Sequence, residues 1–304
     1  MPENYDDLFA EVEQDRAPAE PQGGQLSKEE FAAKMKAERE RLSELAGQTE
    51  MEIASDGGTF QQYLGSLAHF ERYSAQNTLL IFAQRPDAQK IGDFDHWKEA
   101  ETPVRRNETG FYIFEPGKEY QREDGSTGVS MNLKRMFDIS QTEARDNPHP
   151  EPARDTRTLL KSLMSNSPSP IKLVDSLKEG VGARYDTQSG AIEVVRGLAG
   201  DSLFRCLSQE VSYSTLDRLI VAMPQKSDKD FIAYAAAYTI CTKYGIDTKG
   251  FDFSNTPEYF AGRDGKEVRG EIKTIRDAVN NVATRMARGL EPPERKAQSQ
   301  EARS

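Results

Sequence analysis

Apolar residues recur every three or four positions through most of this 304-residue chain, a spacing typical of amphipathic helices. The helices expected from it cover residues 26–47, 59–84, 91–102, 157–164, 201–220, 228–244 and 266–288. Ser27 and Glu30 fit a capping box at the start of the first helix, and Pro86 is expected to stop the second. Gly245 fits the position that follows a helix end. The pattern therefore predicts a chain dominated by helices.

Two pairs of segments have the aromatic and β-branched composition of strands. Residues 110–115 and 131–139 are joined through a turn signal at Asp124-Gly125, and residues 182–186 and 191–195 through Ser189-Gly190. Each pair is expected to form adjacent strands.

Proline-rich residues 145–156 separate the two pairs, and we place a domain boundary there. The predicted fold class is α+β with two domains. An α+β domain over residues 26–146 precedes a mainly helical domain with a small hairpin over residues 153–290. Residues 1–25 and 291–304 are polar, and we expect them to be disordered tails.

Charge and composition narrow the possible partners. The formal net charge is −10, but seven acids against one base lie in the first 24 residues, whereas residues 59–145 hold thirteen acids and eleven bases. This balance permits nucleic-acid binding through a local patch without favouring it. There is no apolar run that predicts a membrane span and no secretory signal. The two cysteines, Cys206 and Cys241, are expected to be buried reduced thiols of a cytoplasmic protein, with a disulfide as the alternative.

Residues 73–86, YSAQNTLLIFAQRP, carry two amides, Asn77 and Gln84, on a helix face that is otherwise apolar. A buried amide needs hydrogen-bond partners. The spacing alone favours a structural role, in which both amides bond to backbone groups of the neighbouring sheet. In the alternative they bond to a ligand, and Tyr73 offers a stacking surface.

The string YSAQNTLLIFAQRPDAQKIGDFDHWK resembles the N-terminal domain of the ArdC-like antirestriction proteins of mobile elements. A second block, MFDISQTE at 136–143, resembles a strand of that family, and residues 106–110 keep the last glycine of a family turn. The resemblance covers about residues 58–145 and implies single-stranded DNA binding through cations and stacking aromatics. The residues implied to bind DNA are Arg72, Tyr73, Asn77, Gln84, Arg85, Lys90, Lys98, Arg105, Arg106, Tyr112, Lys134 and Arg135, with Trp97 and Phe111 as further aromatics that also fit core positions.

Residues 203–216 resemble the metal-binding helix of the family's second, zincin-like domain. There two histidines of a His-Glu-x-x-His motif bind zinc, and the glutamate activates a water molecule. This chain instead reads Gln209-Glu210-Val211-Ser212-Tyr213, and Tyr234 stands at the position of the third ligand. The resemblance therefore implies a pseudoenzyme with no metal or cofactor. Glu210 is expected to hydrogen-bond to Tyr213, Tyr234 or a backbone amide instead.

These observations together predict a non-catalytic, cytoplasmic, single-stranded-DNA-binding accessory protein of a mobile element. Antirestriction or protection of incoming DNA is its expected role, and other mobile-element or conjugation proteins are further expected partners. Two alternatives remain open. One is a protein-interaction scaffold that has lost DNA binding, and the other is a divergent metal-dependent hydrolase that uses Glu210.

Overall fold

The computed structural model describes residues 27–122, 125–146, 155–219 and 226–290. The chain divides into two units, residues 1–41 and residues 42–304. The described part of the first unit belongs to α2 (Lys28–Ser55), which begins with the predicted capping box. Ser27 N–H donates to Glu30 Oε2 at 2.8 Å, and Glu30 N–H donates to Ser27 Oγ at 3.2 Å. The two predicted tails, 1–25 and 291–304, lie outside the described residues.

The predicted helix over residues 59–84 is two helices, α3 (Gly57–Phe70) and α4 (Ala75–Gln84), so the expectation of one helix was wrong. Ser74 causes the break, because its backbone is extended and its side chain accepts the Asn77 N–H at 3.2 Å. A serine in this position caps the helix that follows it. Pro86 follows the end of α4, as expected.

The first sheet is antiparallel, with strand order β1-β3-β2. It consists of β1 (Ile91–Gly92), β2 (Phe111–Gln121) and β3 (Thr127–Asp138), with the short helix α5 (Phe94–Glu99) between β1 and β2. The two predicted strands are present and are longer than predicted. Because β2 stands at the end of the strand order, one of its edges is not paired with another strand of this sheet.

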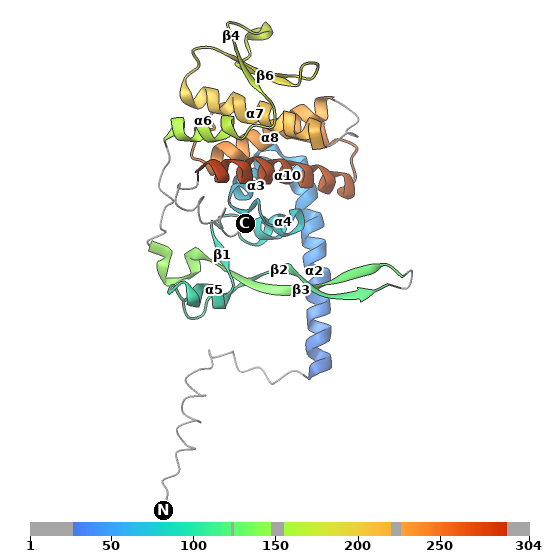
Figure 1. Cartoon of the computed structure of the whole chain (residues 1–304). Coiled ribbons are helices and arrows are strands. Elements are labelled where there is room, and N and C mark those ends of the chain that lie inside the picture. The colour runs from blue at the N-terminus through green and yellow to red at the C-terminus, as the bar shows by residue number, and fades with distance from the viewer. Residues whose placement is uncertain (1–26, 123–124, 147–154, 220–225, 291–304) are drawn as a thin grey trace, which may run out of the picture. The chain divides into compact units, whose positions relative to one another are not determined.

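The later part of the chain forms a second small sheet and a stack of helices (Figure 1). The sheet has the order β4-β6-β5. The β5–β6 hairpin was predicted, whereas β4, which pairs in parallel with β6, was not. The elements are α6 (Thr156–Ser165), β4 (Ile171–Val174), β5 (Ala183–Asp186), β6 (Ala191–Val195), α7 (Gly200–Leu219), α8 (Lys226–Lys243), α9 (Thr256–Phe260) and α10 (Gly265–Leu290).

Gly245 ends α8 as the sequence predicts. Its φ is +68°, and the next residue, Ile246, donates its N–H to the carbonyl of Cys241 at 2.9 Å. This is the hydrogen bond of a Schellman cap, and the left-handed conformation it needs is the one that glycine adopts without strain.

Residues from both sides of the predicted domain boundary share one apolar core. Phe60 of α3 packs on Phe231 of α8 with ring centroids 5.5 Å apart. Farther along α3–α4, Arg276 of α10 donates from Nε to the carbonyl of Tyr73 at 2.7 Å. Residues 147–154, where the boundary was predicted, lie outside the described residues. Within the unit of residues 42–304, α3 therefore packs against α8 across the predicted boundary.

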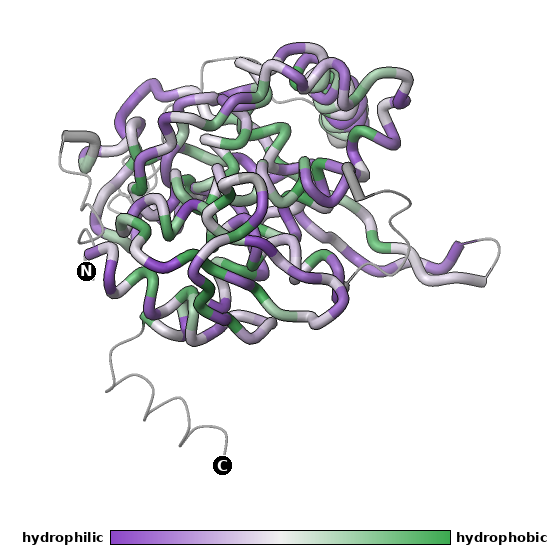
Figure 2. The backbone as a smooth tube through the Cα atoms, turned by 90° about the horizontal axis from the view of Figure 1, so that it is seen from above, coloured by the Kyte–Doolittle hydropathy of each residue, from purple (hydrophilic) through white to green (hydrophobic). Residues whose placement is uncertain are grey.

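The fold is α+β, as predicted. In Figure 2 hydrophobic and hydrophilic stretches alternate along the backbone. Among the described residues, no helix combines the length and the apolar character needed to cross a membrane.

Candidate nucleic-acid interface and the α7–α8 site

Asn77 joins α4 to the free edge of β2. Its side-chain Nδ2 donates to the carbonyl of Phe114 at 2.8 Å, and its Oδ1 accepts the Phe114 N–H at 2.9 Å. Asn77 is buried, so these backbone groups have been removed from water. One amide thus completes the hydrogen bonds that a neighbouring strand would otherwise supply.

Gln84 repeats this arrangement two helical turns later. Its Nε2 donates to the carbonyl of Tyr112 at 2.9 Å, and its Oε1 accepts the Tyr112 N–H at 3.3 Å. Two amides seven residues apart on α4 thus bond to two residues that are two apart on β2. Both amides therefore have the structural role that their spacing favoured, and their hydrogen-bonding groups face the sheet edge.

The first aromatic residue of the motif is also engaged with the core. Tyr73 is half-buried and packs edge-to-face on Phe70 at 6.0 Å. Burial raises the pKa of the Tyr73 hydroxyl. Its neighbour Arg72 is exposed, and the Arg72 carbonyl accepts a hydrogen bond from Arg276 at 3.2 Å.

Two of the predicted DNA-binding cations are held by acidic neighbours. Lys134 Nζ lies 2.9 Å from Asp93 Oδ2 and 3.0 Å from Glu115 Oε1, and these carboxylates raise the pKa of Lys134. Arg105 pairs with Glu108 and donates from Nη1 to the carbonyl of Thr142 at 3.1 Å. Both side chains therefore already form ion pairs within the protein.

The other predicted cations are more accessible. Arg72, Lys90, Lys98, Arg106 and Arg135 are exposed, and Arg85 is half-buried. Two of them lie over aromatic rings: Lys90 Nζ is 5.6 Å from the Trp97 centroid, and the Arg135 guanidinium carbon is 5.8 Å from that of Phe137. These cations are the part of the predicted set that can reach a phosphate.

The predicted aromatics have mostly internal roles. Trp97 is buried and donates from Nε1 to the carbonyl of Phe137 at 2.9 Å, and Phe111 is buried in the same region. Tyr112 is half-buried. Around the first sheet, two other aromatics are more exposed: Phe94 on α5, 46% exposed, and Tyr120 near the end of β2, 50% exposed.

The sequence did not show that Phe94 is exposed while Trp97 is buried, because apolar spacing groups the two residues together. Phe94 precedes Lys98 by one helical turn, so this short helix carries an exposed ring and an exposed cation on one face.

The second motif lies on α7 beside β5. Glu210 Oε2 accepts the backbone N–H of Tyr185 at 2.6 Å, which is the backbone contact anticipated for this carboxylate. Tyr213 is buried beside Tyr185, with ring centroids 5.8 Å apart. Burial, together with the nearby carboxylates of Asp230 and Asp217, raises the pKa of Tyr213 to about 12. The phenol is therefore neutral at physiological pH.

The Tyr234 side chain is hydrogen-bonded to the loop after α8. Its hydroxyl accepts the Asp252 N–H at 2.8 Å and donates to the carbonyl of Gly250 at 3.5 Å. Its ring packs against Phe251 and Phe253 at 4.9 and 5.3 Å. The residue at the predicted third ligand position thus holds a backbone turn.

The residues of the α7–α8 site do not fit a zinc ion. Zinc sites use histidine, cysteine or carboxylate ligands, whereas Gln209, Tyr213 and Tyr234 occupy the three expected positions. Within the described ranges, no three His, Cys, Asp or Glu side chains come together as a metal-binding group. Cys206 and Cys241 are both free thiols, and burial raises the pKa of Cys241 to about 12.

Comparison with known proteins identifies the fold. No protein-family model matches the chain, and no curated protein matches it. The metal-free crystal structure of the antirestriction protein ArdC from plasmid R388 matches with a TM-score of 0.50 and 15% identity, over 71% of this chain and 86% of that one. Its Mn(II)-bound structure has a TM-score of 0.47 and 15% identity, over 71% and 85% of the two chains. The chain therefore has the ArdC-like fold that its sequence motifs indicated.

Proposed function

We propose that this chain is an antirestriction protein of a mobile element that binds single-stranded DNA and has no metal-dependent catalytic activity. The observation that carries the proposal is the shared fold with an antirestriction protein from a plasmid, found in a chain whose residues 58–145 also carry the family's motifs. A direct test is conjugal transfer of unmodified plasmid DNA into a restricting recipient. Transfer should rise when this protein is present and should be unchanged in a recipient that lacks the restriction enzyme.

The DNA-binding part of the proposal rests on the exposed cations beside the first sheet, with Phe94 and Tyr120 as exposed rings. Single strands are bound by cationic tracks with aromatic rings on which bases stack. Affinity for an oligo-dT strand should therefore exceed affinity for a duplex of equal length. It should also fall with salt, with a slope of about −0.7 per phosphate contact in a log–log plot.

Variants can separate binding residues from structural ones. Arg106→Glu should weaken oligo-dT binding and reduce the salt slope by about one contact, because this guanidinium is exposed. Lys266→Glu, the same change of charge at the exposed start of α10, is the matched control. If the wild-type protein does not bind oligo-dT even at low salt, DNA binding is excluded and the scaffold alternative is favoured.

The non-catalytic part rests on the ligand positions. A neutral tyrosine and a glutamine do not replace histidines on zinc, and the Glu210 carboxylate is hydrogen-bonded to β5. Purified protein should contain no stoichiometric zinc, and a chelator should leave its melting temperature unchanged. One zinc per chain with a hydrolytic activity that Glu210→Gln abolishes would establish the hydrolase alternative.

A further experiment tests whether α7 and α8 still hold the three ligand positions at the spacing of a zinc site. The variant Gln209→His, Tyr213→His, Tyr234→Glu restores the three ligand types on α7 and α8. Zinc affinity in the triple variant, compared with Gln209→His alone, would show that the helices still hold the three positions at ligand spacing. Absence of zinc binding in both would show that the two tyrosines have reshaped the site.

A further inference from the structure

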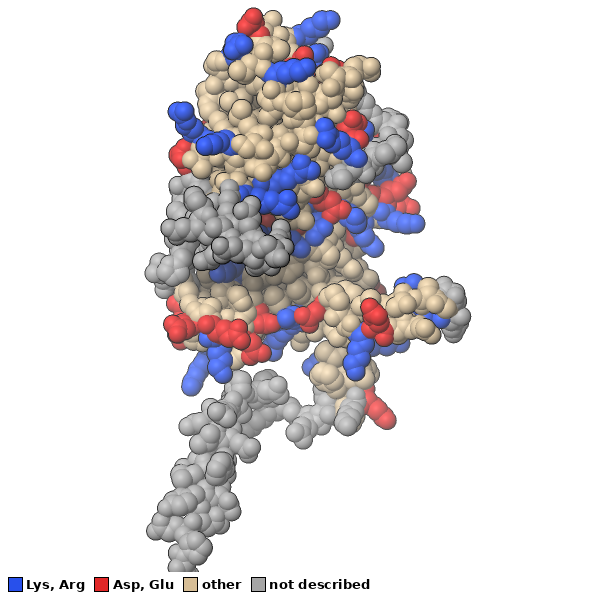
Figure 3. Space-filling model, viewed as in Figure 1, with Lys and Arg blue, Asp and Glu red and all other residues tan. Residues whose placement is uncertain are grey.

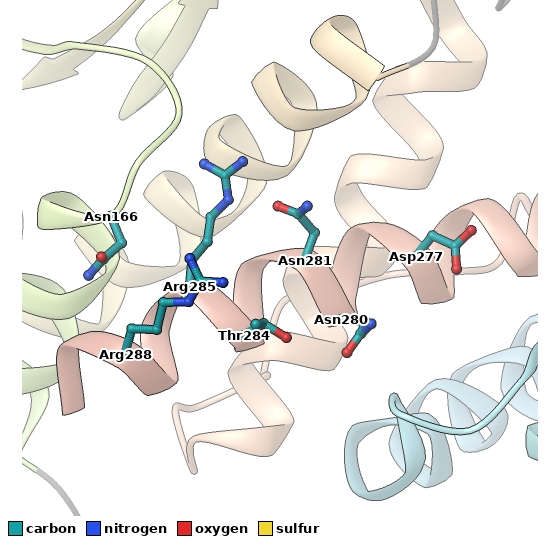
Figure 4. A pocket seen from close by; sticks show the side chains of 7 residues that line it. All are labelled: Asn166, Asp277, Asn280, Asn281, Thr284, Arg285 and Arg288. Carbon is teal, nitrogen blue, oxygen red and sulfur yellow. The ribbon is translucent and has the colours of Figure 1, made fainter. Parts of the chain in front are cut away.

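A polar cavity of about 610 Å³ opens along the C-terminal half of α10 (Figure 4). Most of its lining residues recur every three or four positions on this helix, and one residue at the end of α6 faces them. The lining consists of Asn166, Asp277, Asn280, Asn281, Thr284, Arg285 and Arg288. None belongs to the motifs that the sequence analysis singled out.

Positive charge predominates in this cavity. Arg285 and Arg288 extend from adjacent turns of α10, and Arg218 at the end of α7 is close enough to affect Arg285 electrostatically. Burial, with the charges of Arg218 and Arg288, lowers the pKa of Arg285. In the described parts of the chain, none of these three guanidinium groups forms an ion pair with a carboxylate.

The one carboxylate in the lining is already neutralised. Asp277 Oδ2 pairs with Lys273 Nζ at 2.7 Å, and Asp277 Oδ1 pairs with Arg276 Nη1 at 2.5 Å. Arg285 therefore lies near two further arginines, and none of the three has a carboxylate partner among the described residues. Figure 3 shows Lys and Arg side chains gathered over α10 on the face in view.

A second observation points to a ligand. The amide oxygen Oδ1 of Asn281 is buried and has no hydrogen-bond partner among the described residues. Most buried polar atoms in proteins are satisfied, so such an atom often marks a place where a water molecule or a ligand belongs. Because an amide oxygen only accepts hydrogen bonds, its partner must be a donor, such as a water molecule or a hydroxyl of the ligand, and not an ionised phosphate oxygen. Asn280 and Thr284 add further hydrogen-bonding groups on the same stretch of helix.

We propose that this cavity binds a phosphate group. Arginine guanidinium groups donate paired hydrogen bonds that match the oxygens of a phosphate. The side-chain N–H groups of the lining amides and the Thr284 hydroxyl are further donors for the same oxygens. The described residues that line the cavity include no aromatic side chain, so the phosphate is held without base stacking by them. The phosphate comes either from a nucleic-acid backbone or from a small phosphorylated molecule. The lining shares no residue with the DNA-binding set proposed above.

The test uses the full-length protein and two probes, with affinities measured by calorimetry. One probe is inorganic pyrophosphate, and the other is an oligo-dT strand that has backbone phosphates but no terminal phosphate. Arg288→Glu changes an exposed side chain and is expected to leave the fold intact, which the melting temperature checks. Lys266→Glu is the control, because it makes the same charge change on the same helix about 33 Å away at 1.5 Å per residue. Arg285→Lys keeps the charge but removes the paired donors.

Arg288→Glu should weaken pyrophosphate binding about tenfold or more, Arg285→Lys should weaken it less, and Lys266→Glu should leave it unchanged. A parallel loss for oligo-dT identifies the nucleic-acid backbone as the source of the phosphate, whereas a loss for pyrophosphate alone identifies a small phosphorylated molecule. The proposal is overturned if the wild-type protein does not bind pyrophosphate, or if Arg288→Glu and Lys266→Glu weaken it equally. In either case the effect of Arg106→Glu on oligo-dT still tests the proposed DNA binding separately.

Discussion

Helices α4 and α10 both place amide side chains among apolar ones, but they use them differently. On α4, Asn77 and Gln84 each satisfy a donor and an acceptor of the β2 backbone. On α10, Asn281 has a buried oxygen with no described partner, beside two arginines with no described counterion. The comparison separates polar groups that are hydrogen-bonded within the fold from polar groups that have no described partner.

This difference shows what role the residues of the family-like motif on α4 have. The conspicuous residues of the α4 motif hold the sheet edge, so they identify a fold more directly than a binding surface. The α10 cavity has no conspicuous motif, yet its Asn281 oxygen and its two arginines have no described hydrogen-bond or ion-pair partner, respectively. The sequence signature and the proposed phosphate site therefore lie on different helices.

The strongest test of the comparison is Asn77→Ala. It leaves the buried N–H and C=O of Phe114 without partners, and the free energy of unfolding should fall by about 2–4 kcal/mol. Urea denaturation monitored by circular dichroism measures this. Gln76→Ala, one position earlier on the same helix, should change stability by less than about 0.5 kcal/mol. Equal losses in the two variants would contradict the structural role of Asn77.

Gln84→Ala should have a smaller effect, about 1–2 kcal/mol, in the same denaturation experiment. Gln84 is only half-buried, so water can reach the backbone groups of Tyr112 once the amide is removed. A loss as large as that of Asn77→Ala would mean that burial does not set the difference between the two positions.

Tyr213→Phe extends the comparison to α7, because it should change how the free energy of unfolding depends on pH. The folded-state pKa of Tyr213 is about 12, above the ordinary value near 10, so the unfolded chain ionises first as pH rises. Stability from this group is fully present below about pH 10 and is lost between about pH 10 and 12. The variant should differ by less than about 1 kcal/mol at pH 7 and should lose stability less steeply above pH 10. Denaturation curves at several pH values measure both, and identical slopes would show that Tyr213 is not the titrating group.

Asn281→Leu should have the smallest effect and the opposite sign. Leucine has a similar shape and removes the unsatisfied oxygen, so stability should be unchanged or should rise by up to about 1 kcal/mol. The melting temperature checks the direction. Destabilisation by more than about 1 kcal/mol would show that Asn281 is satisfied in the native protein, and the contrast with Asn77 would then disappear.

Local signals in the sequence predicted local structure well. The Ser27–Glu30 capping box, the Gly245 helix end and the β5–β6 hairpin depend on residues close together in the chain, and all three are present. The break at Ser74 was missed because the apolar spacing of α3 continues into α4 almost without a shift of phase.

Long-range contacts were harder to foresee. The partner of Asn77 lies 37 residues away, and spacing alone could suggest its role without identifying Phe114. The counterions of Lys134 and Arg105 likewise come from the folded arrangement, so the sequence could not show which cations remain exposed. The proline-rich segment suggested separate domains, but composition does not show that α3 packs against α8.

The contact between Glu50 and Arg269 has an evolutionary consequence. Glu50 of α2 is fully buried, and Arg269 of α10 pairs with it through Nε at 2.5 Å and Nη2 at 2.9 Å. A buried carboxylate that loses the cation paired with it strongly destabilises a fold. Gene recombination that exchanged the C-terminal half of this chain would therefore have to bring an equivalent of Arg269. Selection can maintain α10 for this reason alone, whether or not any chemistry remains on α7.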